Sequence, residues 1–244
     1  MNAAKPNSQI FNAYVDGFNL YKGVLEARPE LKWLDVFEYC KSQMLDHTLG
    51  SVYYFTAPVK RRFDQDSAPE RQEKYLRVLK HLGIDVVRGK FRKDAGWFRL
   101  YSRQRAKTIV PEIPRHLGLT QRAIDKAWKQ AVPDSPKAYV WKMHEKGSDV
   151  NLASYLLRDA FRGGIAAALV ITGDSDLVTP IKFAVEEGVF VQVVVPNRKQ
   201  NCEGLRAAAS SLRQIHPVEL TDYLLPEIFI TPKGGNIRRP QAWG

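Results

Sequence analysis

Residues 166–181 constrain the fold of this chain more than any other stretch. Residues 166–172 are small or apolar without alternation, which is typical of a parallel strand buried on both faces, and Gly173 ends the run. Asp174 and Asp176 follow at once. Because open α/β sheets bind ligands just beyond the carboxyl ends of their strands, both carboxylates are predicted to lie where such proteins place their chemistry.

The two acids have a structural and a chemical explanation. Ser175 or Asp176 can cap the helix that runs on toward Glu187, but a cap accounts for one acidic residue and leaves the other unexplained. Two carboxylates on one tight turn repel each other unless a cation or a proton lies between them. The pair therefore favours a metal site.

Strands and helices alternate along most of the chain. Apolar runs and helical spacing predict a strand at 10–16, a helix at 33–45, a strand at 51–56, a helix at 70–82 and a strand at 84–87. Further strands are expected at 166–172 and 189–195, with a last short one beginning near Ile215. This alternation requires right-handed crossovers, so we expect an α/β fold with a parallel sheet of about five to six strands flanked by helices.

Two more acids are predicted at the same edge of the sheet. Asp16 ends the first strand and is followed by Gly17 and Asn19, residue types that turn chemistry and helix capping alone would select. A structural role for Asp16 is therefore at least as well supported as a chemical one. Asp149 opens a helix that runs to Phe161, where the helix dipole also favours an acid. If this helix leads into the 166–172 strand, its amino end lies beside both acid-bearing strand ends.

Positive charge is concentrated in one segment. The chain carries a formal net charge of +11, which suits a polyanionic partner. Residues 86–147 hold 15 Lys and Arg against 5 Asp and Glu, so that stretch contributes 15 − 5 = +10. This segment interrupts the alternation of strands and helices between residues 89 and 139, and it is predicted to form a basic insertion before the helix that begins at Ser148.

The basic insertion has two explanations of similar weight. Aromatic rings beside guanidinium groups can stack on bases and pair with phosphates, which suits single-stranded RNA. Alternatively, the aromatic residues pack on the edge of the sheet and the charges are only solvated. The candidate RNA-binding residues are Arg92, Trp97, Arg99, Arg103, Arg105 and Lys146.

Three short motifs occur in the order found in one known family. They are Val15-Asp16-Gly17-Phe18-Asn19, Lys146-Gly147-Ser148-Asp149-Val150 and Ile171-Thr172-Gly173-Asp174-Ser175-Asp176, with the strand at 188–196 behind them. Over about residues 10–200 the chain resembles the NYN domains, which are LabA-like members of the PIN-like nuclease group. The resemblance implies a Rossmann-like, PIN-like α/β fold and a metal-dependent ribonuclease that hydrolyses phosphodiester bonds.

The resemblance also assigns expected roles at the site. Catalytic positions match Asp16, Asn19, Asp149, Asp174 and Asp176, with the four aspartates as the metal ligands. Hard carboxylate ligands select Mg²⁺ or Mn²⁺, and a metal pair can activate water, neutralise the phosphate and stabilise the leaving oxygen. Thr172 and Ser175 are expected to orient the metal-binding carboxylates without binding the metal themselves.

Two departures and two alternatives accompany this expectation. Some family members carry a further acid where this chain has Tyr155, which leaves the number of ligands open, and the absence of a Cys-rich insertion removes the case for structural zinc. The competing hypothesis is a non-catalytic RNA-binding or adaptor module on the same fold. A phosphatase would need an Asp-x-Asp motif after the first strand, whereas Gly17 and Phe18 follow Asp16.

The expected organisation is one NYN/PIN-like domain at 1–225, with the insertion at 89–139 inside it. Pro, Gly and Arg at 226–244 indicate a basic, flexible tail. Cys40 and Cys202 lie far apart, and no signal peptide or long apolar run occurs, so we expect a cytoplasmic protein without disulfides and without membrane contact. The sequence leaves the oligomeric state open, with a homodimer as one option.

Overall fold

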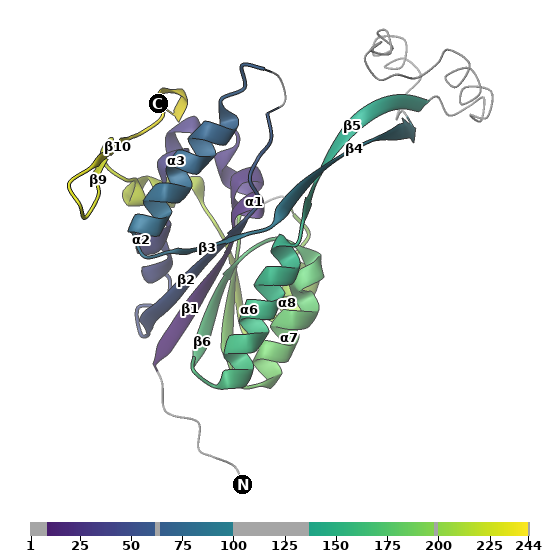
Figure 1. The fold of residues 1–244 in the computed structure, drawn as a ribbon. Coiled ribbons are helices and arrows are strands. Elements are labelled where there is room, and N and C mark those ends of the chain that lie inside the picture. The colour runs from purple at the N-terminus through teal and green to yellow at the C-terminus, as the bar shows by residue number, and fades with distance from the viewer. Residues whose placement is uncertain (1–8, 62–63, 100–136, 198–199, 244) are drawn as a thin grey trace. The chain divides into compact units, whose positions relative to one another are not determined.

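The computed structural model describes residues 9–61, 64–99, 137–197 and 200–243 (Figure 1). The chain divides into two compact units, one made of residues 1–90 and 145–244 and the other of residues 91–144. Each unit is described by itself below. No helix of the described residues has the length and apolar character needed to cross a membrane.

The first unit is built on a sheet of six parallel strands, as the alternation of elements predicted. The strands are β1 (Ile10–Asp16), β2 (Thr48–Thr56), β3 (Asp85–Arg88), β6 (Ala167–Ile171), β7 (Phe190–Val195) and β8 (Ser211–Gln214). Their order in the sheet is β3-β2-β1-β6-β7-β8, with every neighbouring pair parallel. The chain builds the sheet outward from β1 in one direction and then from β6 in the other. The fold is therefore Rossmann-like, with its topological switch point between β1 and β6.

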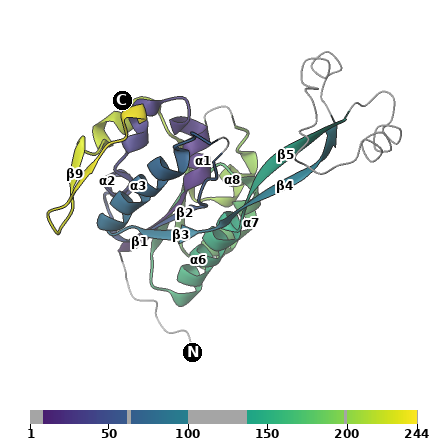
Figure 2. The same ribbon diagram turned by 45° about the horizontal axis from the view of Figure 1, so that its top comes forward.

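Helices cover both faces of this sheet (Figures 1 and 2). One face carries α2 (Val36–Lys41) and α3 (Ala68–His81), and the other carries α6 (Ser148–Arg162), α7 (Val178–Glu186) and α8 (Glu203–Ala208). Successive residues of β1 alternate between the two cores, with Val15 in the first and Tyr14 in the second. A strand buried on both faces favours apolar residues on both sides, which explains why β6 is a continuous apolar run and why Asn12 alone interrupts the apolar residues of β1 before Asp16.

The helix expected at 33–45 is shorter than its apolar spacing suggested. A 3₁₀ turn, η2 (Pro29–Trp33), precedes it, and α2 begins only after Asp35, whose Oδ1 accepts a hydrogen bond from the Glu38 backbone N–H at 3.0 Å. The cap fixes the start of the helix because it satisfies a backbone donor that the helix leaves unpaired. Trp33 and Leu34 are fully buried, so their apolar character reflects the core and not the helix.

The helix that carries Asp149 is bounded by two glycines. Gly147 precedes α6 with φ of 90°, and Gly163 follows it with φ of 68°; both values lie in the left-handed region that favours glycine. One face of α6 buries Leu152, Leu156 and Ala160 against the sheet. Because α6 runs away from the carboxyl edge of the sheet and the chain returns through β6, the amino end of α6 lies at that edge.

The second unit contains the part of the basic insertion that the structure describes. Strands β4 (Lys90–Arg99) and β5 (Lys137–Lys146) pair as a two-stranded sheet. The Trp97 and Tyr139 rings meet edge to face, with their centroids 5.4 Å apart. Arg103 and Arg105 lie outside the described residues.

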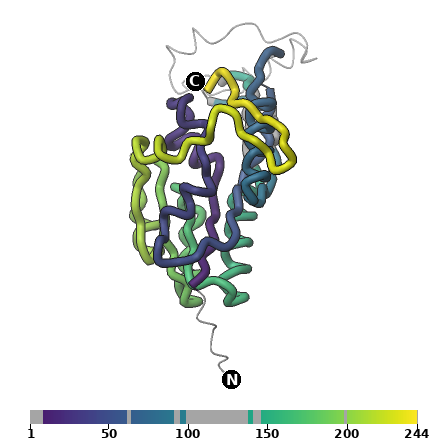
Figure 3. The backbone as a smooth tube through the Cα atoms, turned by 90° about the vertical axis from the view of Figure 1, so that its left-hand side faces the viewer, coloured from purple at the N-terminus to yellow at the C-terminus, as the bar shows by residue number. Residues whose placement is uncertain are grey.

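The flexible tail expected at 226–244 is wrong for the described residues 226–243. Strands β9 (Ile228–Ile230) and β10 (Asn236–Arg238) form an antiparallel hairpin, and η6 (Gln241–Trp243) follows. The Trp243 ring lies 6.0 Å from Trp33 and 6.0 Å from Tyr75, centroid to centroid. Figure 3 shows this yellow segment crossing the purple and blue helical layer. Burial of a large aromatic side chain holds the segment in place despite its Pro and Gly content.

Candidate active site at the switch point

Residues from two adjacent strands form the candidate site. Asp16 is the last residue of β1, and Thr172, Gly173 and Asp174 follow β6 directly. The Asp16 side chain is almost entirely buried, with 1% of its surface exposed. These residues occupy the carboxyl edge of the sheet at the switch point, the position where open α/β sheets bind ligands.

Asp16 is held by three hydrogen bonds. Its Oδ1 accepts from the Asn19 backbone N–H at 2.9 Å, and its Oδ2 accepts from Asn19 Nδ2 at 2.7 Å and from Thr172 Oγ1 at 3.2 Å. Burial raises the pKa of the Asp16 carboxyl, and these three bonds oppose that increase. The oxygens of Asp16 are therefore largely engaged in holding the α1 turn (Gly17–Leu20) to β6.

The network continues through the loop after β6. Asn19 Oδ1 accepts from the Gly173 backbone N–H at 3.3 Å, and Thr172 Oγ1 accepts from the Asp174 N–H at 3.1 Å. Asp174 then caps the short 3₁₀ turn η4 (Ser175–Leu177), because its Oδ1 accepts from the Asp176 N–H at 3.0 Å. The helix cap in this turn is thus Asp174 and not Ser175 or Asp176, both of which are exposed.

The carboxylates of Asp149 and Asp176 make no hydrogen bond to another described residue, and of these two only Asp149 is partly buried. It lies half-buried in the first turn of α6. Its pKa is raised to about 6, first by burial and then by the charges of Asp16, Asp174 and Asp176. The mutual repulsion shows that all four carboxylates share one site, where strand geometry placed them, and that a proton is bound to Asp149 more readily than to an ordinary aspartate.

Close backbone contacts shape the walls of the site. A Cβ at Gly17 would lie 2.5 Å from Cε1 of Tyr54, so only glycine allows the α1 turn to pack on this ring. Gln200 donates from Nε2 to the Gly173 carbonyl, which places Gln200 against the turn between Thr172 and Asp174. Phe18 lies two positions after Asp16 and is 42% exposed.

Sequence reasoning missed Gln200 and the exposed aromatic side chains beside the acids. Phe18 and Tyr21 are both partly exposed, and they lie three positions apart on α1 and the π-helical turn η1 (Tyr21–Leu25). Two aromatic residues three positions apart on a helix share one face, so the sequence could have predicted an aromatic surface next to Asp16. Gln200 offered no such signal, because only the fold brings the loop after β7 to Gly173.

The structure places the RNA-binding candidates only in part. Trp97 is partly buried against Tyr139, Arg92 and Arg99 lie on β4, and Lys146 is exposed at the end of β5. Binding of single-stranded RNA therefore stays a prediction.

Among residues 9–61, 64–99, 137–197 and 200–243, no group of three or more His, Cys, Asp or Glu side chains is arranged to hold a metal ion. The four aspartates share a site, but their oxygens do not converge on one point. Asp16 and Asp174 direct theirs at hydrogen-bond donors of the chain itself.

The chain is similar in sequence to a curated protein and distantly similar in fold to a solved structure. No family model matches the chain. The chain is 27% identical over 255 residues to the 6-hydroxy-3-succinoylpyridine 3-monooxygenase HspA of Pseudomonas putida, an alignment that covers 94% of this chain and 74% of the relative. The chain is also similar to the crystal structure of a protein of unknown function from Vibrio parahaemolyticus, with 15% sequence identity and a TM-score of 0.46. The superposition covers 91% of this chain and 100% of the Vibrio chain.

The relative overturns two expectations. A monooxygenase that resembles nearly the whole chain contradicts both the ribonuclease and the Mg²⁺ or Mn²⁺ cofactor, although it agrees with the broader expectation of an enzyme. Repulsion among these carboxylates does not require a metal ion. Hydrogen bonds to Asp16 and Asp174 and the readily protonated Asp149 relieve the repulsion that was attributed to a metal.

Proposed function

We propose that this chain is an oxidoreductase that hydroxylates a small hydroxylated nitrogen heteroaromatic compound at the switch-point site. The alignment with a monooxygenase of this kind over 94% of the chain carries the proposal. The site supports it with a partly exposed aromatic side chain, Phe18, two positions after Asp16, and with a carboxylate of raised pKa, Asp149. Phe18 offers a face on which a planar ring can stack.

The substrate named for the relative suggests what the carboxylate contributes. Its hydroxyl group at ring position 6 lies para to ring position 3, the position that the name of the relative gives for oxygen insertion. Loss of the proton from that hydroxyl group moves electron density to the carbon at position 3. A carbon richer in electrons reacts faster with an electrophilic oxygen species, so a base at the hydroxyl group accelerates the reaction. Position 3 carries the succinoyl group, so the bond from the ring to this group breaks as the new C–O bond forms, and water takes up the released acyl group as a carboxylic acid.

Asp149 suits the role of that base better than its neighbours do. A general base works best when its pKa is near the working pH, and the Asp149 pKa of about 6 is close to neutrality. Asp16 accepts three hydrogen bonds and is almost fully buried, so its role is to hold the turn and to raise the pKa of Asp149. Asp174 is engaged as the cap of η4.

Monooxygenation transfers one atom of O₂ to the substrate and reduces the other to water with two electrons. Flavin and nicotinamide nucleotides supply such electrons, but both carry phosphates. The described helix starts at this edge bear Asp16, Asp149 and Asp174, whose charges repel a phosphate. The described residues therefore do not fit a nucleotide cofactor at this edge, and the chain's own residues are assigned only substrate binding and proton transfer.

The direct test is oxygen incorporation. Purified protein is incubated with 6-hydroxy-3-succinoylpyridine, NADH, a free flavin and ¹⁸O₂, and products are analysed by mass spectrometry. We expect a product that carries one ¹⁸O atom, and a loss of rate of about 10²- to 10⁴-fold in Asp149→Asn, the usual contribution of a general base. The rate should rise with pH through about 6 in the wild type, because Asp149 accepts a proton only when ionised.

Asp85→Asn is the matched control for that substitution. Asp85 is an exposed aspartate at the start of β3, at the opposite end of the sheet, and its replacement should leave the rate and its pH dependence unchanged. A complete absence of labelled product from the wild type under all reductants tried would refute the oxygenase. Equal rates for wild type and Asp149→Asn would refute the role of Asp149 alone.

We further propose that the fold is the PIN-like form of the NYN domains and that the protein is cytoplasmic. The six-stranded order supports the first proposal, together with the arrival of three separate motifs, at Asp16, Asp149 and Asp174, at one switch point. Two buried free cysteines, Cys40 and Cys202, are compatible with a reducing compartment. Neither proposal implies nuclease activity.

A further inference from the structure

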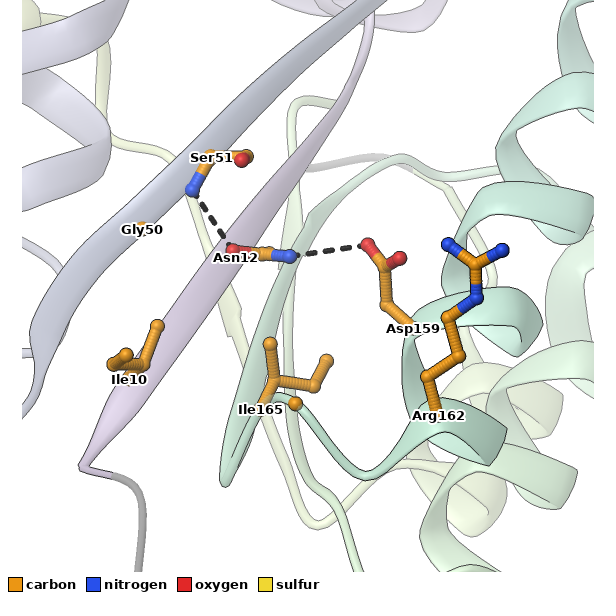
Figure 4. A pocket seen from close by; sticks show the side chains of 8 residues that line it. Ile10, Asn12, Gly50, Ser51, Asp159, Arg162 and Ile165 are labelled. Atoms are coloured by element: carbon orange, nitrogen blue, oxygen red, sulfur yellow. Dashed lines mark hydrogen bonds between the residues drawn. The ribbon is translucent and has the colours of Figure 1, made fainter.

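A second site candidate lies at the opposite end of the sheet. A cavity of about 260 Å³ opens where the amino halves of β1 and β2 meet the carboxyl end of α6 and the turn into β6 (Figure 4). Ile10 and Ile165 provide apolar surface, while Asn12, Ser51 and Asp159 provide polar groups. Six strand positions separate Ile10 from Asp16, so this cavity lies about 20 Å from the acidic cluster.

A hydrogen-bond network holds a buried carboxylate beside this cavity. Asp159 is 9% exposed, and its Oδ2 accepts from Asn12 Nδ2 at 3.0 Å and from the Tyr14 hydroxyl at 2.8 Å. Its Oδ1 accepts from Arg158 Nε at 2.8 Å. Asn12 is fixed in turn, because its Oδ1 accepts from the Ser51 backbone N–H at 2.8 Å. A carboxylate has about four acceptor positions, so Asp159 keeps room for one further donor.

Two polar groups at the cavity are not used by the fold. The Arg162 guanidinium and the Ser51 hydroxyl make no hydrogen bond or ion pair with another described residue. Arg162 lies in the last turn of α6, where a cation stabilises the helix dipole, and this explains its charge. It does not explain the open space beside it.

Glycines keep that space open. A Cβ at Gly50 would lie 2.6 Å from Asn12 Oδ1 and 2.8 Å from Ile10 Cγ2, so a larger residue would displace the groups that form the floor. A Cβ at Gly164 would meet nothing within 4 Å. A buried acceptor, a cation without a partner among the described residues and an apolar wall thus line a cavity of the size of a small metabolite.

We infer that this cavity binds a small α-amino acid with an apolar side chain. Its ammonium group donates to Asp159, its carboxylate binds Arg162 and the Ser51 hydroxyl, and its side chain packs against Ile10 and Ile165. The ion pair with Arg158 already balances the charge of Asp159, which leaves Arg162 as the net charge of the cavity and favours a ligand with a carboxylate. The inference is independent of the proposed oxygenase, because it uses none of the residues of that site.

Titration of the full-length protein with leucine, followed by calorimetry and by NMR of the Asn12 side-chain amide, tests the inference. Leucine should bind saturably, whereas 4-methylpentanoate, which lacks the amine, and 3-methylbutylamine, which lacks the carboxylate, should each bind about tenfold more weakly. These analogues remove one ligand group at a time and leave the buried Asp159 network intact.

Two variants locate the binding. Arg162→Gln should weaken leucine binding about tenfold and abolish its preference over 3-methylbutylamine. Arg77→Gln is the matched control, because Arg77 is an exposed arginine on α3, on the other face of the sheet, and should bind leucine as the wild type does. Asp149→Asn should also leave leucine binding unchanged, which separates this cavity from the switch-point site.

Three results would overturn the inference. They are no saturable leucine binding up to roughly 10 mM, where even a weak specific site would be filled; equal affinity of wild type and Arg162→Gln; and equal affinity for leucine and both truncated analogues.

Discussion

The carboxyl group of Asp149 differs from its neighbours in what surrounds it. Asp16 and Asp174 are fixed by donors from the chain, whereas Asp149 has burial and three negative charges around it and no hydrogen bond to a described residue. Both effects favour its neutral form and raise its pKa from 3.8 to about 6. The raised pKa of Asp149 should therefore affect the pH dependence of protein stability as well as that of catalysis.

Proton linkage gives the direction of the effect on stability. An acid whose pKa is raised by folding stabilises the fold while it is protonated, and this stabilisation is lost as the pH rises from about 4 through about 6. The shift corresponds to about 3 kcal/mol before screening, and to about 1 kcal/mol for a half-exposed group in water. Asp149→Asn, which stays neutral, should therefore melt about 2 to 4 °C higher than the wild type at pH 7.5 and at the same temperature at pH 4.

Thermal melts of both proteins across this pH range provide the measurement. Asp85→Asn serves again as the control, since an exposed aspartate outside the site should give no difference that depends on pH in this way. If Asp149→Asn were no more stable than the wild type at pH 7.5, the carboxylates would not repel one another as their geometry indicates.

At the scale of elements, the segment after Leu225 shows how one aromatic side chain orders a chain of low intrinsic structure. The Trp243 ring packs on Trp33 and Tyr75, and Trp33 Nε1 donates to the Pro226 carbonyl at 2.9 Å. The Tyr75 ring in turn contacts Tyr54, the ring on which Gly17 rests beside Asp16. The segment thus forms part of the packing behind the site.

Trp243→Ala should lower the stability of the protein by about 3 kcal/mol, at the lower end of the cost of removing a core aromatic side chain, because the terminal segment can detach. Thermal and urea unfolding followed by circular dichroism measure the change. Ile230→Ala, in the same hairpin but 69% exposed, should change stability by less than about 0.5 kcal/mol. Equal stability of wild type and Trp243→Ala would mean that the segment does not pack on the core.

At the scale of the molecule, the sequence predicted the sheet and the edge that carries the acids. Strands buried on both faces leave unbroken apolar runs, and parallel strands end at one edge, so the positions of Asp16, Asp149 and Asp174 followed from strand order. The chemistry did not follow, because an acidic cluster has the same sequence whether a metal, a proton or hydrogen bonds relieve its repulsion.

Other features depended on contacts that no local pattern records. Asn12 and Asp159 are separated by 147 positions, and their hydrogen bond at the cavity appears only when α6 packs on β1. Trp243 likewise belongs to the core only because the chain folds back over Trp33. The residues that sequence reasoning assigned to the wrong structure were those whose partners are distant in sequence.

The most direct test of the account is the absorption spectrum of 6-hydroxy-3-succinoylpyridine bound to the protein in the absence of any reductant. Ionisation of the ring hydroxyl changes this spectrum, so it reports on proton transfer without turnover. We expect the ionised form to appear on binding to the wild type, with a pH midpoint near the Asp149 pKa of about 6, and to be absent with Asp149→Asn. A bound compound whose spectrum is the same in both proteins at every pH would contradict it.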